Sequence, residues 1–567
     1  MTSHWARNRL LVGTGALFAL RLLLSLVRTG PLVVADEVGY LTNARVITGG
    51  LAGQLHQAPF YRGGYSLVIA PVVGLFSDPK LAYHLVLVVN ALLAASLFPL
   101  LYLLLSRALG VAPRTAIWAA FAAALYPAVT ILSQAALSEN ALFPLVCLWL
   151  LALAELLSAR TPRTQVLWAV GFALAAGGMW VVHYRMGGAV AITVIVLLGL
   201  GVRRRLAPAA VIAGLLVIAA ALWGTSALDH FLHDHNYGAV AENEASERFD
   251  DLTTASGAGN ALLNLVGQSW YLLVSTFGLA AIVIADTWSK FRRRAGGDGA
   301  ETSGDKAANS VWGPSAIVLA LLALAALLLL TSAAAFPERI RPDMLIYGRY
   351  VEIVTPPLIA IGLWLVATRK ELRRAVGPLA AIAVLTLAVV AIRAIHVDPG
   401  EASRWNVSGL PFVTGQLGPG ILVGAGVLAA LGAWALLRAT EVRAWAAPAL
   451  AAAMFLAIVA YGTWNPVITS QRGAYPAGWA SPEPIAAERG ITSLGYDLAD
   501  YDALGLYATQ WFLPDTEVRL LHAGDDPPLP RYVLASHSWP RQHPHTPAKL
   551  VWDDVGRDQA IYRLTQR

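Results

Sequence analysis

The sequence predicts a polytopic α-helical membrane protein with a small water-soluble domain at its C-terminus. Three observations predict this fold class: the composition, a series of long apolar segments, and the placement of basic residues between those segments. Of the 567 residues, 57% are hydrophobic and only 13% are charged, and the mean hydropathy is +0.58. A soluble protein carries about 25% charged residues. The excess apolar surface must therefore face lipid.

About thirteen apolar segments are long enough to cross the hydrocarbon core of a bilayer as helices. Two of them, 115–132 and 187–202, are shorter than the others. Together the segments make residues 1–463 a predicted transmembrane domain. They are 9–27, 82–106, 115–132, 139–157, 166–183, 187–202, 207–228, 262–286, 313–335, 350–367, 375–396, 415–437 and 444–463.

The basic residues predict an orientation. If the N-terminus is cytoplasmic, all six predicted inside loops are basic, as the positive-inside rule requires. The loop 28–81, with its juxtamembrane helices, and the C-terminal segment then lie outside the cytoplasm. The abundance of Ala, Leu and Arg indicates a GC-rich bacterial genome, so the predicted location is the bacterial plasma membrane. The basic residues are Arg107, Arg114, Arg160, Arg163, Arg203, Arg204, Arg205, Lys290, Arg292, Arg293, Arg294, Arg369, Lys370, Arg373, Arg374, Arg438 and Arg443.

The composition changes after residue 463, where the long apolar runs stop and turn residues become frequent. Segments such as EVRLL, KLVWDD and AIYRL are typical of short strands or mixed elements between turns. Residues 464–567 are therefore predicted as one small extracytoplasmic α/β domain. The only cysteine, Cys147, lies in an apolar run, so this domain folds without an intramolecular disulfide. Its role is either that of a stabilising cap or that of a platform for an acceptor.

Three acidic residues are candidates for chemistry. Asp36 and Glu37 directly follow the first span, and Glu139 lies at the outer mouth of the fourth. A carboxylate at this level could act as a general base on an acceptor hydroxyl, or as a metal ligand. The alternative is structural: Asp36 as a helix N-cap, Glu37 as a first-turn acid favoured by the helix dipole, and Glu139 as an interfacial anchor.

Arginines in the predicted outer loops are candidates for binding a phosphate, because the planar guanidinium group bonds two oxygens at once. Arg349 is the best of them, since Tyr347 and Tyr350 flank it at the head of a span; Arg62 and Arg339 are further candidates. The alternative is that these arginines bind lipid headgroups or pair with nearby acids. Those acids are Glu338, Asp343 and Glu352.

Histidines outside the predicted spans leave a metal site open. His230, His233 and His235 cluster with interleaved acids, which indicates either a metal site or a solvated loop. His183 lies in a short outer turn that could border a polar cavity. A divalent cation held by Asp36, by Glu139 or by the three histidines is thus possible, with no certain cofactor. The sequence has no Walker A loop and no other nucleotide motif, so an activated substrate outside the cytoplasm is expected in lipid-linked form.

Taken in order, these features resemble the GT-C glycosyltransferases. The features are Asp36–Glu37 after the first span, the segment YRGGYSL, the Ser138–Glu139 pair, the Gly348–Arg349–Tyr350 triplet and a small outer C-terminal domain. Within the superfamily, the chain is most similar to the branch of protein O-mannosyltransferases, aminoarabinose transferases and arabinofuranosyltransferases. It departs from the aminoarabinose transferases at Gly63 and Gly64, where prolines are common.

The resemblance implies a GT-C-like fold and a polyprenyl-phosphate sugar as donor. It implies that Asp36, accompanied by Glu37, is the general base and that Glu139 lies near the acceptor or a metal. We also expect His183 in that vicinity, from its place in the outer turn, and a single displacement of a hexosyl or pentosyl group with inversion. The resemblance also implies that the donor phosphate meets basic side chains. The acceptor would be an extracytoplasmic glycan, lipid or protein, and no nucleic acid is expected as a partner. The resemblance assigns Arg349 and Arg62 to the donor phosphate, and the positions of Arg339, Tyr347 and Tyr350 make them further candidates for it.

Two alternative functions remain open from the sequence. A transporter or flippase of lipid-linked sugars would bind the same phosphate but would not need an acid at the lipid–water boundary. A non-catalytic scaffold for cell-envelope assembly would tolerate replacement of Asp36 and Arg349.

Overall fold

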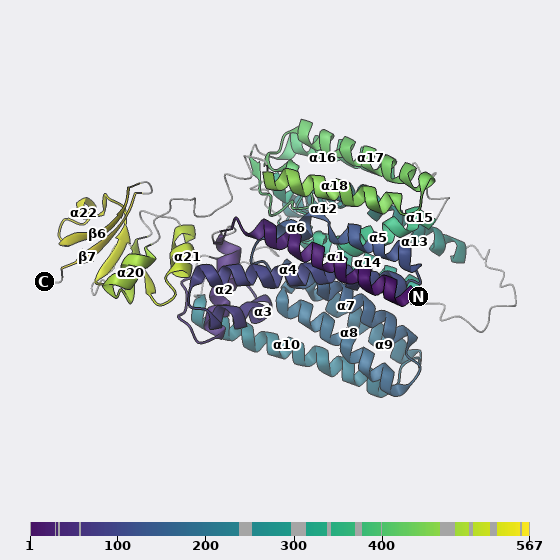
Figure 1. Cartoon of the computed structure of the whole chain (residues 1–567), viewed down its shortest axis with the longest axis horizontal. Helices are drawn as coiled ribbons and strands as arrows, with labels where there is room; N and C mark the ends of the chain where they lie inside the picture. The colour runs from purple at the N-terminus through teal and green to yellow at the C-terminus, as the bar shows by residue number, and fades with distance from the viewer. Residues whose placement is uncertain are drawn as a thin grey trace.

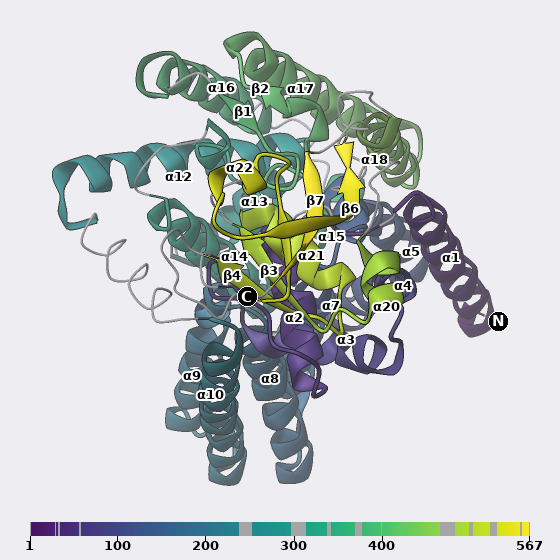
Figure 2. The same ribbon diagram turned by 90° about the vertical axis from the view of Figure 1, so that its left-hand side faces the viewer.

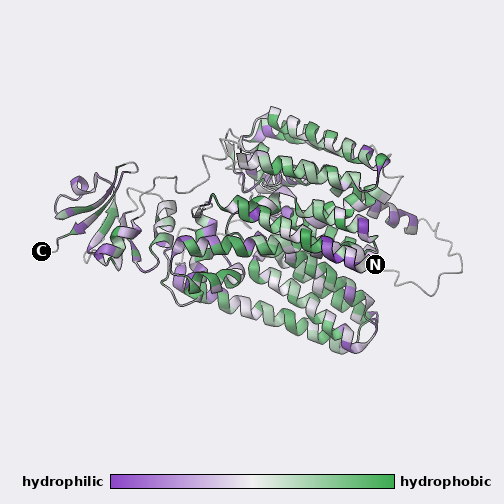
Figure 3. Ribbon diagram, in the orientation of Figure 1, coloured by the Kyte–Doolittle hydropathy of each residue, from purple (hydrophilic) through white to green (hydrophobic). Residues whose placement is uncertain are grey.

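The protein is a long bundle of apolar helices with a small sheet-containing region beyond one end (Figure 1). The computed structural model describes residues 2–28, 30–31, 34–55, 58–237, 252–295, 313–336, 342–368, 377–397, 400–464, 482–497, 503–521, 530–555 and 558–565. Apolar residues dominate the bundle, whereas hydrophilic residues gather in the C-terminal region and at the helix ends (Figure 3). This distribution confirms the predicted fold class.

Within the described residues, eleven helices are long and apolar enough to cross a membrane, or twelve if one bent pair counts as a span. The eleven are α1 (Thr2–Ser25), α4 (Pro79–Leu103, continued by η1, Leu104–Ala108), α7 (Glu139–Ser158), α8 (Pro162–Val182), α9 (Gly187–Val202, preceded by η2, Tyr184–Met186), α10 (Pro208–Asn236), α14 (Gly313–Ala334), α15 (Thr355–Thr368, preceded by η5, Val351–Val354), α16 (Gly377–His396), α17 (Pro419–Val442) and α18 (Ala446–Trp464). Seen from the end, α8–α10 and α16–α17 lie on opposite sides of the bundle (Figure 2).

Two predicted spans have a different form. The segment 115–132 makes two short helices, α5 (Pro113–Ala124) and α6 (Pro127–Leu132). Pro127 lacks an amide hydrogen, so its ring ends the preceding helix. The buried Arg21 of α1 donates to the carbonyl oxygen of Ala124 at 2.7 Å, which satisfies a group that the break leaves open.

The segment 262–286 makes the bent pair, α12 (Ala255–Ser275) and α13 (Leu279–Ala295), whose axes differ by 102°. The chain turns at Phe277 and Gly278, both of which have positive φ, at 49° and 72°. Glycine adopts this conformation at no steric cost, which is why the turn falls there. These two segments account for the difference between about thirteen predicted spans and the 11 or 12 in the described residues.

Two shorter helices, α2 (Val34–Ile47) and α3 (Gly63–Leu75), lie at the end of the bundle nearest the C-terminal region (Figure 1). This end is called the α2 end. The juxtamembrane helix predicted after the first span is therefore present. It does not simply rest on a membrane by its apolar face, because the polar Thr42 and Asn43 are as buried as Val38 and Leu41.

The C-terminal region contains a five-stranded mixed sheet with the strand order β4-β3-β5-β7-β6. Strand β3 is parallel to β4 and β5, whereas β7 is antiparallel to β5 and β6. The predicted α/β character is confirmed, and the segment around LGLYATQWFL proves to be a helix, α21. The elements are α20 (Glu483–Arg489), β3 (Ser493–Asp497), α21 (Ala503–Phe512), β4 (Glu517–Leu521), β5 (Tyr532–Ala535), α22 (Trp539–Gln542), β6 (Ala548–Asp554) and β7 (Gln559–Leu564).

Helix α21 is docked onto α2 through Arg45, whose guanidinium donates to the carbonyl oxygens of Gln510 and Trp511 at 2.8 and 3.0 Å. The N-terminus lies at the opposite end of the bundle (Figure 1). One end of the bundle thus carries α2 and the docked helix α21, and the other end carries the N-terminus. The cytoplasmic position of the N-terminus stays a prediction.

A connecting segment also reaches the α2 end. Residues 400–418 contain a two-stranded ribbon of β1 (Glu401–Ala402) with β2 (Gly415–Gln416), and η7 (Pro411–Val413) lies between the strands. Together with η4 (Pro342–Met344), this segment covers the chain around Arg349. The backbone N–H of Gly348 donates to the carbonyl oxygen of Asn406 at 2.8 Å.

Candidate active site

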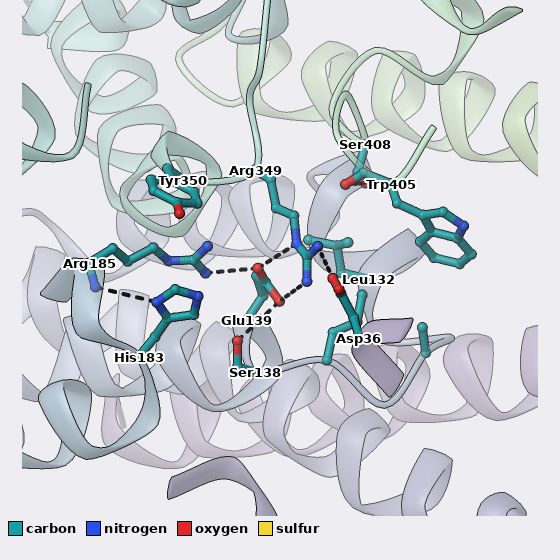
Figure 4. A network of polar contacts seen from close by, with 12 residues as sticks. Asp36, Leu132, Ser138, Glu139, His183, Arg185, Arg349, Tyr350, Trp405 and Ser408 are labelled. Atoms are coloured by element: carbon teal, nitrogen blue, oxygen red, sulfur yellow. Dashed lines mark hydrogen bonds and ion pairs between the residues drawn. The ribbon is translucent and has the colours of Figure 1, made fainter. Parts of the chain in front are cut away.

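Arg349 lies between two carboxylates that come from distant parts of the chain (Figure 4). Its Nε donates to Oε1 of Glu139 at 2.7 Å, and its Nη2 lies 3.3 Å from Oε2 of the same residue. Its Nη1 forms an ion pair with Oδ2 of Asp36. One guanidinium therefore joins the first turn of α2 to the first turn of α7.

Glu139 holds a second cation. Nη2 of Arg185, in η2, donates to Oε1 of Glu139 at 2.8 Å, and neither side chain is more than 1% exposed. Burying a charge is costly unless it is paired and hydrogen-bonded. Here two arginines face two acids, Asp36 and Glu139, so the buried cluster is formally neutral.

The pKa values outside the spans follow from this arrangement. Burial lowers the pKa of Arg349, but the charges of Glu139 and Asp36 outweigh it and raise that pKa above its ordinary value. Arg349 is thus a permanent cation. Burial, and then the charge of Arg185, lower the pKa of His183 well below its ordinary value, so this imidazole is neutral at pH 7.

Asp36 is the carboxylate of the cluster that remains accessible. Its side chain is 22% exposed, whereas that of Glu139 is 0% exposed. Its Oδ1 accepts a hydrogen bond from the hydroxyl of Tyr61 at 2.8 Å. Asp36 lies inside the first turn of α2 rather than before it, and its carboxylate bonds side chains from other segments. The structure thus gives it these partners instead of the N-cap role that the sequence left open.

Glu37 lies outside the cluster. It is fully buried, and its Oε1 accepts hydrogen bonds from the hydroxyl of Tyr83 at 2.7 Å and from the backbone N–H of Ala136 at 2.6 Å. These bonds hold α2 against α4 and against the turn before α7. The two adjacent acids therefore have different surroundings, with Asp36 beside Arg349 and Glu37 within the packing of the bundle.

Of the other predicted phosphate-binding residues, the two tyrosines lie at the Arg349 cluster, whereas Arg62 has separate partners. Tyr350 belongs to the Arg349 cluster, because Arg185 lies 4.6 Å from the centre of its ring and its hydroxyl lies 3.0 Å from that of Tyr184. The ring of Tyr347 packs against that of Tyr350 at 5.5 Å.

Arg62 has partners of its own. It pairs with Asp229 at 3.3 Å and lies 4.0 Å from the ring centre of Trp180. Its positive charge nevertheless acts on His183. Arg339 lies outside the described residues.

The candidate metal ligands do not gather in the described part of the chain, where no three His, Cys, Asp or Glu side chains are arranged to hold a metal ion. His230 lies 3.6 Å from Asp234, and the ring of His235 contacts the carbonyl oxygen of Phe231 in its own helix. His233 packs near Phe60 instead. Asp36 and Glu139 share Arg349, so the guanidinium takes the position between the carboxylates that a divalent cation would need.

Two of the acids that the sequence offered as partners of the arginines, Glu352 and Asp343, are buried beside the cluster. Oε1 of Glu352 accepts hydrogen bonds from the hydroxyl of Tyr271 and, at 2.7 Å, from the backbone N–H of Gly409. Asp343 accepts from Asn406 at 2.6 Å and from the backbone N–H of Ser403 at 3.1 Å. These acids were considered as partners of Arg349, but they instead hold the 400–418 segment over it.

No protein-family model and no curated protein matches the sequence. Among solved structures, the chain is similar to ArnT from Cupriavidus metallidurans bound to undecaprenyl phosphate, with a TM-score of 0.56 and 14% identity over 97% of this chain and 97% of that chain. The apo form of the same protein aligns with a TM-score of 0.53 and 13% identity over 99% and 98%. Arabinosyltransferase EmbB from Mycobacterium smegmatis aligns with a TM-score of 0.41, which is too low to support an inference, at 18% identity over 84% of this chain and 42% of that chain. The whole-length match to ArnT confirms the predicted GT-C-like fold and shows no more than the fold at this identity.

Proposed function

We propose that the protein is a membrane glycosyltransferase that moves a sugar from a polyprenyl-phosphate donor to an acceptor hydroxyl, with Asp36 as general base. The observation that carries the proposal is the ion pair of Arg349 with a partly exposed Asp36 and a buried Glu139 at one end of a GT-C-like bundle. In this arrangement the proposed base, Asp36, is directly hydrogen-bonded to the proposed phosphate-binding cation, Arg349.

The donor class follows from the same charges. ArnT, which shares the fold, has been crystallised with undecaprenyl phosphate. In the present chain the charges of the cluster are balanced, so an incoming phosphate competes with Asp36 for Arg349. Binding of the donor would thus take the guanidinium from Asp36 and leave that carboxylate open to an acceptor. Glu139 and Arg185 are fully buried and would stay in place as the fixed part of the cluster.

The reaction is a single displacement. The acceptor oxygen attacks the anomeric carbon from the face opposite the phosphate, and its proton passes to Asp36. The bond between the anomeric carbon and the phosphate oxygen breaks, and the electron pair stays on the phosphate. Arg349 stabilises the charge that develops on this leaving group. The anomeric configuration inverts because only one displacement occurs.

The parts of the chain receive separate roles in this proposal. Residues 1–463 carry the transfer, and residues 464–567 form an extracytoplasmic domain close to the acceptor. Support for the second assignment comes from the docking of α21 on α2, the helix that carries Asp36. The predicted bacterial plasma membrane, with the α2 end facing outward, would give the enzyme access to lipid-linked sugars.

The test is the substitution Asp36→Asn, which keeps the size of the side chain and removes the base. Purified protein in lipid would be given a polyprenyl-phosphate sugar and candidate acceptors, with release of polyprenyl phosphate as the readout. We expect release to fall at least about 100-fold, within the range that general-base catalysis contributes. The matched control is Glu441→Gln, an exposed acid at the end of α17. Full release with Asp36→Asn would reject the assignment.

The same readout separates the alternatives. A flippase would move the donor between leaflets without releasing polyprenyl phosphate, and a scaffold would do neither. Release that depends on both Asp36 and an added acceptor is expected only of a transferase.

A further inference from the structure

A second basic site lies beside the Arg349 cluster, in a cavity of about 210 Å³. Its walls come from the last turns of α1, from α6 and the turn that follows it, from the last turn of α18, and from the 400–418 segment. Helix α6 lies against α18, and α1 passes close by (Figure 1). The cavity is thus at the α2 end of the bundle, at the level where three predicted spans end, 9–27, 115–132 and 444–463.

The polar part of the lining is cationic. Arg28, which follows α1, and Arg404 from the 400–418 segment both line the cavity, and they are only 7% and 6% exposed. A cavity lined by two buried arginines is complementary to an anion with several oxygens, because each guanidinium group can bond two of them.

A buried hydroxyl adds a third polar group. Thr130 lines the cavity and is 0% exposed, and its Oγ1 has no hydrogen-bond partner among the described residues. A buried hydroxyl without a partner costs free energy, so such a group indicates a ligand that completes it. It is available to donate to an anion held by the two arginines.

The remaining walls are apolar and face outward. Leu23 of α1 and Val27 in the turn after it line the cavity, yet their side chains are 65% and 53% exposed. In a membrane this surface meets lipid, and the end of a span lies at the level of the headgroups. An anion that reached the arginines could therefore keep a hydrocarbon chain along α1.

We propose that this cavity binds the phosphate headgroup of an anionic membrane lipid, with Arg28 and Arg404 on the phosphate and an acyl chain along Leu23 and Val27. The apolar walls favour a lipid over free phosphate. The site is separate from the Arg349 cluster, since none of the cluster residues lines the cavity. The inference goes beyond the proposed transfer and stands whether or not the transfer occurs.

The experiment measures the lipid retained by the protein. Wild-type protein and the double variant Arg28→Gln/Arg404→Gln would be purified in mild detergent, and the phospholipids bound per protein would be quantified by mass spectrometry. We expect at least about tenfold less phosphatidylglycerol on the double variant, because the loss of even one charge-assisted hydrogen bond weakens binding by about that factor. Thr463→Phe, which fills the cavity and keeps both arginines, should lose the lipid equally.

The control is Arg438→Gln, an exposed arginine at the end of α17, which should retain the wild-type amount. A second measurement compares melting temperatures in phosphatidylglycerol and phosphatidylcholine nanodiscs. We expect a higher value in phosphatidylglycerol that both cavity variants abolish. Unchanged retention of phosphatidylglycerol in the double variant and in Thr463→Phe would overturn the proposal. Equal stabilisation by inorganic phosphate alone would overturn the lipid as the ligand.

Discussion

Charge balance decides what each residue of the Arg349 cluster can do. Two guanidinium groups and two carboxylates share a small buried volume, and only Asp36 retains substantial exposure. A buried ion pair gains little net stability, but the loss of one partner is expensive because the other charge stays buried. Substitutions in this cluster are therefore expected to separate into those that change stability and those that change catalysis.

Arg349→Lys should weaken donor use and leave the charge balance intact. A lysine supplies one cation but cannot bond the two oxygens of Glu139 and also reach Asp36 or a phosphate. We expect the KM for the polyprenyl-phosphate donor to rise about tenfold or more, with a smaller fall in kcat, because a charge-assisted hydrogen bond is worth about 1.5–3 kcal/mol. Steady-state kinetics at varied donor concentration measures both constants. Donor kinetics equal to those of the wild type would contradict the role of Arg349.

Glu139→Gln should instead destabilise the fold. It removes the carboxylate that pairs Arg185 and Arg349, and it leaves a buried cluster with two cations and one acid. The expected loss is about 3–5 kcal/mol, the usual cost of breaking a buried pair from one side. Thermal unfolding in detergent should show a much larger fall than for Asp36→Asn, since Asp36 is 22% exposed. Equal stability of the two variants would argue against this difference between the acids.

The adjacent residues Asp36 and Glu37 show how far the sequence can predict the site. The sequence placed Asp36, Glu139 and Arg349 at the ends of predicted spans on one side of the membrane, which made all three candidates for the site. It could not separate Asp36 from Glu37, since adjacent residues on a helix point about 100° apart and only the packing decides which one meets Arg349. The partnership of Arg185 with Glu139 depends equally on how η2 folds back over α7.

At the scale of helices, hydrophobicity predicted where the spans are but not where they break. The breaks at Pro127 and at Phe277–Gly278 depend on single residues within apolar runs. Close packing between helices is a further property that hydrophobicity does not reveal. Gly64 is an example of such close packing. A Cβ at this position would lie 2.5 Å from backbone atoms of Val181 and Val182. Gly64 is also one of the two glycines that stand where prolines are common in the aminoarabinose transferases.

Gly64→Ala should therefore destabilise the bundle. The first turn of α3 would have to move away from the last turn of α8, because backbone atoms cannot rotate aside as a side chain can. We expect a loss of about 1–3 kcal/mol, as for other substitutions that overpack a core. The matched control is Gly424→Ala in α17, where a Cβ meets nothing within 4 Å and where alanine is the better helix former. A melting temperature for Gly64→Ala as high as that of the control would contradict the close approach.

At the scale of the whole molecule, the fold concentrates its chemistry at one end. The Arg349 cluster, the docked helix α21 and the cavity of Arg28 and Arg404 all lie at the α2 end, whereas the N-terminus lies at the other (Figure 1). The order of spans and the α/β character of the C-terminal region followed from the sequence. The docking of α21 on α2 did not, because it depends on one buried arginine, Arg45, reaching carbonyl oxygens 465 and 466 positions further along the chain.

Because the proposed donor and acceptor meet on the outer side of the membrane, the orientation of the molecule is the prediction on which the proposed function most depends. The sequence assigns the C-terminal domain to the outside and the loop containing Arg204 to the cytoplasm, from the positive-inside rule. Single-cysteine labelling can test both assignments, since the only native cysteine, Cys147, is buried and can be replaced by alanine. Glu488→Cys, at a side chain 68% exposed, reports on the C-terminal domain, and Arg204→Cys, also at an exposed position, reports on the loop.

We expect a membrane-impermeant maleimide to label Glu488→Cys in intact spheroplasts and to label Arg204→Cys only after the membrane is opened. Detergent-solubilised protein provides the control, because both cysteines should then react. The reverse pattern would place Asp36 and Arg349 on the cytoplasmic side, since α2 lies at the same end of the bundle as the C-terminal region. A transferase with its site there would meet nucleotide-activated sugars and would have no need of a lipid-linked donor, so this outcome would remove the main reason for the proposed substrate.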